Sequence, residues 1–186
     1  MTRYFIGLMV PSGIRERVYA FAQGIGSEIP REHSSKPIWN DPTDLHCTLL
    51  FIGQYSDEQE LTQSMEQVAR NLSPVTLALE GRTHWLGRNS LALAVTGADS
   101  VGTAFVEQLG HLSSDNRVGT RPFYGHVTLG RVRPVPRPDD GAFAGHTVEP
   151  MTWNDDQVQL MRSRNADSGP RYEVVSERPF HGEPTQ

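Results

Sequence analysis

Apolar residues recur along this chain with two spacings, the alternation typical of strands and the three-to-four-residue interval typical of helices. Residues 4–10 form a short apolar run that predicts a buried strand. The segment after it predicts a helix that Ser12 caps and that Gly24 and Gly26 end. The apolar residues at helical spacing in this segment are Ile14, Val18, Phe21 and Ile25.

A second strand and helix follow a polar connection over residues 30–42 that carries Trp39. Residues 45–53 predict the strand. Residues 56–59, Ser-Asp-Glu-Gln, form a capping box that opens the helix, and Pro74 stops it. The apolar face of this helix consists of Leu61, Met65, Val68 and Leu72.

Two further strands are predicted at residues 75–79 and 91–95, with Trp85 in a third short segment between them. A third helix then begins at a cap formed by Asp99 or Ser100. Its apolar residues are Val101, Phe105, Leu109 and Leu112.

The last part of the chain predicts strands interrupted by a long connection. A strand over residues 126–129 is broken by three prolines between 134 and 138, and the irregular connection they open ends near Asp155. A hairpin of two strands, 158–161 and 172–175, closes the chain.

The tetrapeptide His-x-Thr-Leu occurs twice, at residues 46–49 and 126–129, with the two histidines 80 residues apart. A random arrangement of the same residues would hold two copies in roughly one case per thousand, so chance is a poor explanation. The offset suggests two similar α+β lobes, each contributing one copy.

Strand geometry indicates what each copy offers chemically. Side chains on a strand alternate between faces, so His46 and Thr48 share one face, and so do His126 and Thr128. Histidine changes charge near neutral pH, and threonine can hydrogen-bond an anionic oxygen. Two such strands facing each other would supply an acid, a base and two hydrogen-bond donors around one phosphate.

Composition narrows the class of protein. The length fits one domain over residues 1–186, or two small lobes sharing a sheet, and no segment approaches the ~20 apolar residues of a membrane span. Cys47 is the only cysteine, which excludes an internal disulfide and agrees with a cytoplasmic protein. Because Cys47 lies on the apolar face of the first motif strand, we expect a core residue rather than a nucleophile. We also expect a monomer.

The net charge of −5 argues against sequence-independent coating of nucleic acid, yet the charge is uneven. Acids are absent between Asp115 and Asp139. The arginines of this stretch, which brackets the second motif, are Arg117, Arg121, Arg131, Arg133 and Arg137. They form either a solvated surface or a rim that attracts phosphate.

The two motifs resemble those of the 2H phosphoesterase superfamily, and the chain is similar to its RNA 2′,3′-cyclic phosphodiesterase branch, historically called 2′-5′ RNA ligases. The segments that carry the resemblance are RYFIGL at 3–8, LHCTLLFIG at 45–53, RPFYGHVTLGR at 121–131, LMRS at 160–163 and YEV at 172–174. Gly125 and Gly130 stand where the family pattern has Pro and Ala.

The resemblance implies an α+β, bilobal, pseudo-twofold fold in which two antiparallel sheets line a central cleft and helices lie outside. It implies hydrolysis of 2′,3′-cyclic phosphate ends to 2′-phosphates without metal or cofactor, with His46 as the acid at the 3′ oxygen and His126 as the base for water. The residues alone do not order the two histidines. Thr48 and Thr128 would bind the phosphate.

Arg131 would also suit a phosphate, but it follows His126 by five residues and should point to the opposite face of a regular strand. A bulge at Gly130 would turn Arg131 into the cleft. Trp39, Phe5 and Phe123 could stack on a base, although core packing is the simpler expectation for each.

Several alternatives stay open. A metal site is one alternative, but two histidines without a carboxylate on the same strand face are a poor ligand set, and Asp139-Asp140 and Asp155-Asp156 are expected to be solvated. A serine triad is another, but the sequence contains no Gly-x-Ser-x-Gly elbow. The remaining histidines are expected at the surface, namely His33, His84, His111, His146 and His181. The substrate could be an RNA end, a small cyclic nucleotide or an ADP-ribose cyclic phosphate. Ligase activity and a non-catalytic RNA-end-binding module are further possibilities.

Overall fold

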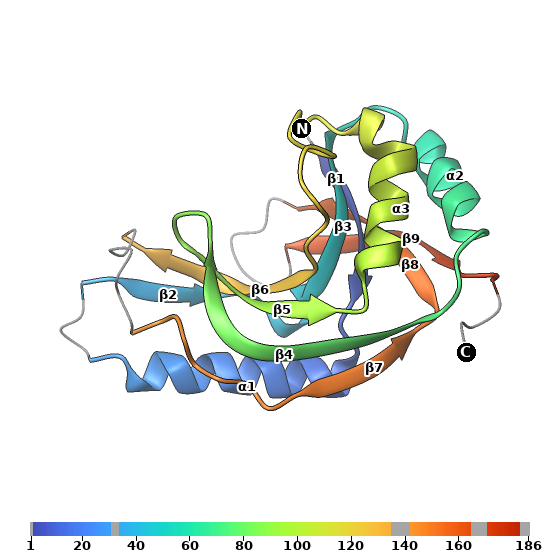
Figure 1. Ribbon diagram of the computed structural model, residues 1–186. Coiled ribbons are helices and arrows are strands. Elements are labelled where there is room, and N and C mark those ends of the chain that lie inside the picture. The colour runs from blue at the N-terminus through green and yellow to red at the C-terminus, as the bar shows by residue number, and fades with distance from the viewer. Residues whose placement is uncertain (1, 31–33, 135–141, 165–170, 183–186) are drawn as a thin grey trace.

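The structure is a computed structural model that describes residues 2–30, 34–134, 142–164 and 171–182. Its strands form one curled antiparallel sheet in the order β7-β4-β5-β6-β3-β1-β8-β9, with β2 pairing to β6 (Figure 1). The strands are β1 (Arg3–Met9), β2 (Lys36–Trp39), β3 (His46–Gln54), β4 (Val75–Leu86), β5 (Ser90–Thr96), β6 (His126–Arg133), β7 (Met151–Asp155), β8 (Gln157–Ser163) and β9 (Tyr172–Pro179). The helices are α1 (Ser12–Glu28), α2 (Glu58–Ala69) and α3 (Asp99–Leu109), with 3-10 turns η1 (Pro42–Asp44) and η2 (Gly110–Leu112).

The sheet has two halves that meet at one point. Strands β1, β3, β8 and β9 form the first half, and the other five form the second. In the described residues β3 and β6 pair only at Cys47 and Val127, so the halves diverge on either side of this pair. The α+β fold is confirmed, and the two expected sheets are joined into one at this contact.

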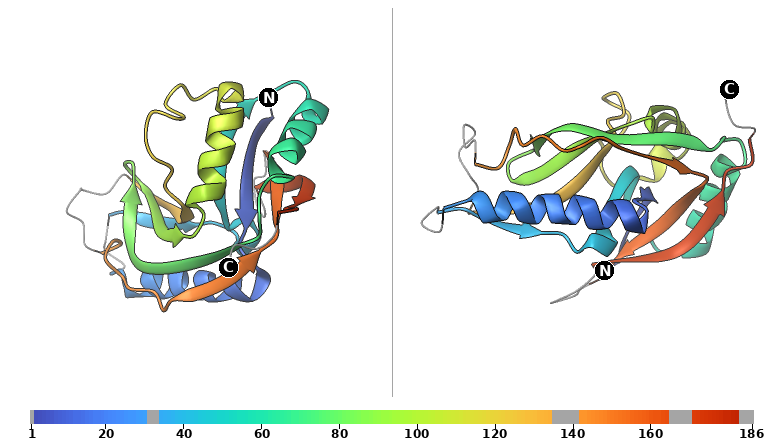
Figure 2. Two further views of the ribbon diagram at one scale, coloured as in Figure 1. Left: turned by 45° about the vertical axis from the view of Figure 1, so that its right-hand side comes forward. Right: turned by 90° about the horizontal axis from the view of Figure 1, so that it is seen from below.

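The helices cover the outer faces of the two halves. Helices α2 and α3 lie together against the half that contains β3, and α1 runs beneath the half formed by β2, β4, β5 and β6 (Figures 1 and 2). Apolar side chains fill the space between helices and strands, among them the fully buried Ile6, Leu50, Ile52 and Phe105. Each such side chain contributes about 1.5–3 kcal/mol by leaving water, so this packing fixes the path of the motif strands.

The predicted end of the first helix is wrong. Helix α1 continues through Gly24 and Gly26 to Glu28, because Ile25 and the following Ile29 are buried and hold the last turn on the core. Gly26 also has a packing role, since an added Cβ would lie 3.1 Å from Trp39 Nε1. Ser12 does not cap the helix, because Pro11 occupies the N-cap position and no side chain bonds there.

The other two caps also differ from the prediction. Helix α2 begins one residue later than expected, with Asp57 rather than Ser56 accepting the N–H of Glu60. Helix α3 has Ala98 at its N-cap without a side-chain bond, so neither Asp99 nor Ser100 caps it. Burial of Phe105 and its neighbours stabilises α3 in place of a cap.

Two strands were not predicted. Strand β2 lies within the supposed polar connection and pairs with the rim of β6, where Pro37 is tolerated because β2 is an edge strand. Strand β7 lies within the supposed irregular connection before Asp155 and pairs with residues Val75–Leu79 of β4.

Strand β4 merges two predicted segments. It runs from Val75 to Leu86 and includes Trp85, with a register shift between Glu80 and His84 where Gly81 has φ of 86°. The bulge interrupts the alternation of apolar and polar residues, so the sequence pattern predicts two short segments where the structure has one bent strand. The closing hairpin of β8 and β9 is confirmed. No helix in the described part of the chain is long and apolar enough to cross a membrane.

Candidate active site between the two histidine strands

The two motif histidines are held in the same way. His46 Nδ1 lies 2.6 Å from the carbonyl oxygen of Asp44, and His126 Nδ1 lies 3.0 Å from the carbonyl oxygen of Tyr124. A carbonyl only accepts, so Nδ1 carries the hydrogen in each ring. Nε2 is then the nitrogen that can take or give a proton, and in His46 it lies 3.1 Å from Thr48 Oγ1.

The pairing of Cys47 with Val127 brings the two motifs together. Extending that antiparallel register by one residue sets His46 across from Thr128 and Thr48 across from His126. All four side chains are partly buried and lie on the face opposite the fully buried Cys47 and Val127. On this register the two imidazoles stand diagonally from one another, and so do the two hydroxyls.

Aromatic rings enclose His46. The ring centroid of Phe5 lies 4.7 Å from that of His46, and Tyr172 meets both rings edge-on, at 4.9 Å from Phe5 and 5.1 Å from His46. The pKa of His46 is lowered from 6.5 to about 4, chiefly by burial, with the Asp44 carbonyl opposing the shift and the charge of His126 adding to it. His46 is therefore neutral at pH 7 when no anion is bound.

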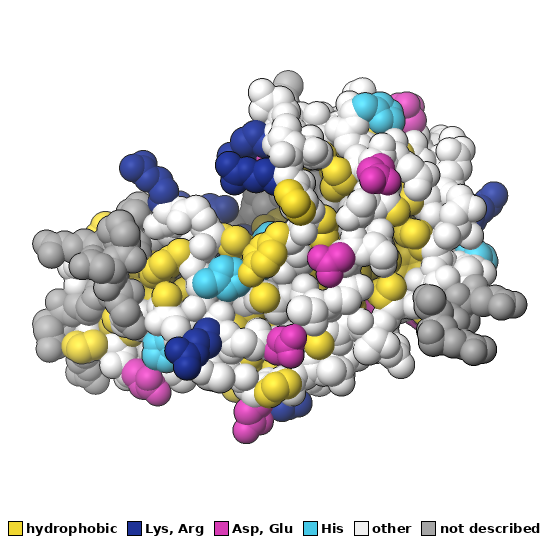
Figure 3. All heavy atoms as spheres, viewed as in Figure 1, with side chains coloured by type: hydrophobic (Ala, Val, Ile, Leu, Met, Phe, Trp, Pro, Cys, Tyr) yellow, Lys and Arg dark blue, Asp and Glu magenta, His cyan; other side chains and the backbone are white. Residues whose placement is uncertain are grey.

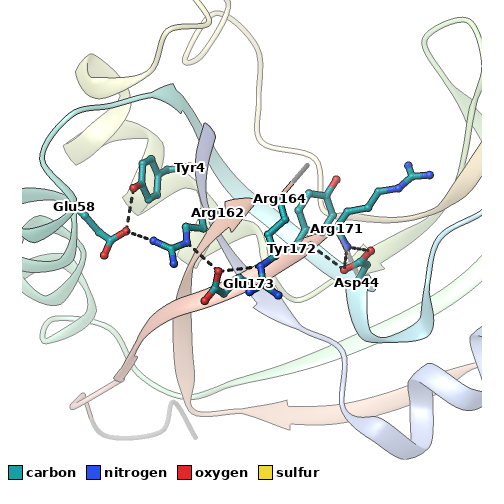
Figure 4. Close-up of polar contacts among 8 residues, drawn as sticks. All are labelled: Tyr4, Asp44, Glu58, Arg162, Arg164, Arg171, Tyr172 and Glu173. Carbon is teal, nitrogen blue, oxygen red and sulfur yellow. Dashed lines mark hydrogen bonds and ion pairs between the residues drawn. The ribbon is translucent and has the colours of Figure 1, made fainter. Parts of the chain in front are cut away.

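Asp44 fixes this enclosure from behind. Its side chain is 1% exposed, and its carboxylate accepts the backbone N–H of Arg171 at 2.8 and 3.0 Å and that of Tyr172 at 3.1 Å (Figure 4). The same residue accepts Nδ1 of His46 through its carbonyl. One residue thus sets both the ring orientation of His46 and the position of Tyr172 beside it.

A second polar network supports strand β9, which carries Tyr172, and the strands beside it. Glu58 at the start of α2 accepts bonds from Tyr4 of β1 at 2.9 Å and from Arg162 of β8 at 3.1 Å (Figure 4). Arg162 also donates to Glu173 of β9 at 3.0 Å. The network ties three strands to one helix and holds β9 in register with β8.

His126 has a more open environment. The Tyr124 ring stacks beside it at 6.0 Å and 21°, and the Tyr124 hydroxyl lies 3.1 Å from Nε2 of His84 on β4. Burial lowers the pKa of His126, the Tyr124 carbonyl opposes that shift, and the charge of His84 adds to it. His84, predicted only as a surface residue, therefore lies beside the site.

Arg131 reaches the same face through a bulge. Thr128 pairs with Ala92 but Gly130 pairs with Leu91, so β6 carries one extra residue, Leu129, against β5. The shift reverses the alternation and turns exposed Arg131 toward the cleft. Burial and the Asp44 carboxylate raise the pKa of Tyr172, and the positive charges of Arg131 and Arg171 oppose that shift, so Arg131 acts across the cleft.

The bulge itself is held by Asn40, just after β2. Its backbone N–H donates to the carbonyl of Leu129 and its side-chain amide donates to the carbonyl of Thr128, both at 2.8 Å. These bonds satisfy carbonyls around the extra residue. The segment from β2 to η1 therefore shapes both halves of the site.

The surface is hollowed where the two halves diverge. In Figure 3 a depression lies between the part bearing α2 and α3 and the part formed by β2, β5 and β6, with histidine and hydrophobic side chains beside it and cationic side chains on both sides. A separate cavity of about 520 Å³ lies between α3 and residues 119–123. Its lining residues include none of the four motif side chains.

The remaining candidates are buried or packed against other elements. Cys47 is fully buried, and burial raises its thiol pKa to about 12, as expected of a core residue. Asp155 is 8% exposed, so the expectation that it is solvated is wrong, because alternation along β7 turns it inward. Phe5 packs in the core beside His46, and Phe123 packs on Gly102 of α3.

Some predictions lie outside the described residues, namely those for His33, Arg137 and Asp139-Asp140. Within the described part of the chain, no three His, Cys, Asp or Glu side chains gather closely enough to hold a metal ion. Sequence reasoning missed Asp44 and Tyr124 as site residues. Each stands two residues before a motif histidine, and this shared spacing was the available signal.

Two curated proteins are similar to the chain along most of its length. The RNA 2′,3′-cyclic phosphodiesterase of Thermotoga maritima is 24% identical over 157 residues, which cover 77% of this chain and 80% of that protein. The RNA 2′,3′-cyclic phosphodiesterase of Bacillus subtilis is 24% identical over 190 residues, covering 92% and 93%. The predicted resemblance to the 2H phosphoesterases is confirmed.

Solved structures show the same 2H phosphoesterase fold. The protein TT0787 of Thermus thermophilus matches with a TM-score of 0.70 and 22% identity, over 97% of this chain and 99% of that one. E. coli LigT, in its complex with NADP+, matches with a TM-score of 0.68 and 22% identity over the same shares. No model of a protein family matches the sequence.

Proposed function

We propose that the protein is an RNA 2′,3′-cyclic phosphodiesterase that opens terminal cyclic phosphates by acid–base catalysis with His46 and His126. The observation that carries the proposal is the pairing of Cys47 with Val127, which puts both imidazoles and both threonine hydroxyls on one face of neighbouring strands. The names of the two curated relatives agree with this substrate.

The proposed reaction needs no covalent intermediate. His126 takes a proton from water as the water oxygen attacks phosphorus, and the bond from phosphorus to the 3′ oxygen breaks. His46 gives its proton to that oxygen, leaving a 2′-phosphate. Each histidine suits this role because its Nδ1–H is engaged by a carbonyl and its Nε2 exchanges the proton.

The phosphate oxygens would be held by the hydroxyls of Thr48 and Thr128 and by Arg131. Negative charge builds on these oxygens as the attacking water adds, so fixed donors lower the barrier. Arg131 adds a positive charge at the rim of the second motif without an acid close to it along the chain. The two threonines stand diagonally, one beside each histidine, and so can bind separate oxygens.

The experiment is hydrolysis of an oligoribonucleotide that ends in a 2′,3′-cyclic phosphate, followed by chromatography of the product. We expect a 2′-phosphate end, and a loss of roughly 10²- to 10⁴-fold in rate for His46→Ala and for His126→Ala. A 3′-phosphate product would mean that the 2′ oxygen leaves instead of the 3′ oxygen. Full activity in either variant would refute the mechanism.

Metal dependence is tested in the same assay. Because the proposed acid, base and phosphate donors are all side chains, we expect the rate to be unchanged by a chelator. Loss of activity in the chelator, restored by one divalent ion, would favour metal catalysis instead.

A further inference from the structure

Two successive carbonyls of β6 face the same residue, Asn40, just after β2. The carbonyls of Thr128 and Leu129 both accept hydrogen bonds from it, at 2.8 Å each. Along a regular strand successive carbonyls point to opposite sides, so a residue beside the strand meets only one of the two. The extra residue of β6 in its pairing with β5, Leu129, brings both carbonyls to one side. The bulge therefore requires one additional donor.

Asn40 supplies that donor with its side chain. Its backbone N–H donates to Leu129, as the next residue of a paired strand would, and its side-chain amide donates to Thr128. A carbonyl only accepts, so the amide nitrogen, not the amide oxygen, faces Thr128. Without this donor a partly buried carbonyl would lose its partner, which would favour a return of β6 to the regular strand.

The backbone on both sides of Asn40 is fixed. Before it, β2 lies so close to β6 that an added Cβ on Gly130 would be 2.5 Å from the carbonyl oxygen of Ile38. After it, η1 is capped by Asp41, whose carboxylate accepts the backbone N–H of Thr43 at 2.9 Å. The amide of Asn40 is thus presented to β6 at little further cost in backbone entropy.

We propose that Asn40 is a positioning residue for the phosphate site, and that it acts by holding the bulge that turns Arg131 into the cleft. This inference rests on the proposed function. Without the bulge the alternation of β6 would continue unbroken from His126, and Arg131, five residues later, would point to the opposite face. The amide of Asn40 is bonded to the backbone of β6, so its effect on the substrate passes through Arg131.

The test is a double-mutant cycle on kcat/KM for a nucleoside 2′,3′-cyclic phosphate. Arg131→Gln should lower kcat/KM by about 10- to 150-fold, the range for a lost bond to a charged group. Asn40→Ala should lower it by about 10-fold or more, because the arginine is displaced. In the Arg131→Gln background, Asn40→Ala should lower it by less than about 3-fold, because the group that it positions is already absent.

A second variant tests the donor itself. Asn40→Asp keeps the size of the side chain but replaces the donor with an acceptor, so it should behave as Asn40→Ala does, and it carries the cycle if Asn40→Ala fails to fold. Asn71→Ala is the matched control, because the amide of Asn71 also donates to a backbone carbonyl, that of Gln67 at 3.1 Å, just after α2. It should leave kcat/KM unchanged. Urea unfolding gives the folded fraction to which each rate is referred.

The outcomes separate the two proposals. Losses that multiply in the double variant, or wild-type kinetics in Asn40→Asp, would overturn the positioning role. Calorimetric titration with inorganic phosphate measures the same cycle without catalysis, and Asn40→Ala should weaken phosphate binding in the wild type but not in Arg131→Gln. If the wild type hydrolyses no cyclic phosphate, the proposed function fails and this titration decides alone. Phosphate binding that is absent from the wild type, or unchanged by Asn40→Ala, would then refute the positioning role.

Discussion

Cys47 on β3 and Val127 on β6 form the one backbone pair that joins the two halves of the sheet among the described residues. Each residue directly follows a motif histidine, so the junction of the fold is also the centre of the candidate site. The strands separate on either side of the pair, which opens the cleft while keeping the four motif side chains adjacent.

The threonines provide the first prediction. Thr48→Val and Thr128→Val keep the branched shape and remove only the hydroxyl, so each should lower kcat/KM by a factor equivalent to about 1.5–3 kcal/mol, the range for a bond to a charged partner. Steady-state kinetics measures the loss, and circular dichroism should show unchanged folding. Wild-type kinetics in both variants would remove the threonines from the phosphate site.

The two histidines should also behave as one unit. Because they serve a single coordinated proton transfer, the double variant His46→Ala/His126→Ala should lose much less rate than the product of the single losses. Single-turnover kinetics of the three variants measures this. Strictly multiplicative losses would mean that the histidines act in separate steps.

The pH dependence of kcat/KM follows from the free protein. The reaction needs one protonated and one neutral imidazole, and the pKa values of both histidines are lowered, that of His46 to about 4. The maximum of kcat/KM should therefore lie below about pH 6.5, the ordinary histidine value. A bound phosphate favours the imidazolium, so the maximum of kcat should lie at higher pH. A kcat/KM maximum above pH 7 would contradict this.

The lowered pKa of His46 should also make the free energy of unfolding depend on pH. His46 stays neutral in the folded protein to about pH 4, whereas in the unfolded chain it binds a proton near pH 6.5. Unfolding therefore takes up a proton between these values, and the His46 contribution to stability falls by about 2 kcal/mol from pH 7 to pH 5. Urea unfolding of wild type and His46→Asn should show this difference. Parallel pH profiles would show that His46 titrates normally.

Much of this site follows from local pattern. Alternation alone places His46 with Thr48 and His126 with Thr128, because regular strands have a fixed period. Arg131 does not follow in this way, since its direction depends on one extra residue in β6 that only the pairing with β5 reveals. The contact of His84 with Tyr124 joins residues 40 positions apart, so no local sequence pattern predicts it.

The missed strands have a similar cause. Strand β2 contains Pro37 and is short, so its propensity is low, and it forms because the rim of β6 offers an unpaired edge. Strand β7 ends in Asn154 and Asp155, residues typical of turns, and Asp155 occupies an inward position. Tertiary pairing overrode local preference in both strands.

Asp44 provides the last prediction, because its contacts separate positioning from chemistry. Asp44→Ala removes the acceptor of two backbone N–H groups but keeps the backbone carbonyl that holds His46 Nδ1. We expect a loss of about 2–4 kcal/mol in the free energy of unfolding, since buried donors are left without a partner. We also expect a lower kcat in the folded fraction, because Tyr172 is released from His46. Asp57→Ala is the control, as it removes a carboxylate that accepts one backbone N–H, that of Glu60 at the start of α2, and contacts neither motif histidine. It should lower stability by about 1 kcal/mol and leave kcat unchanged. An Asp44 variant with full kcat and reduced stability would limit Asp44 to joining β9 to η1.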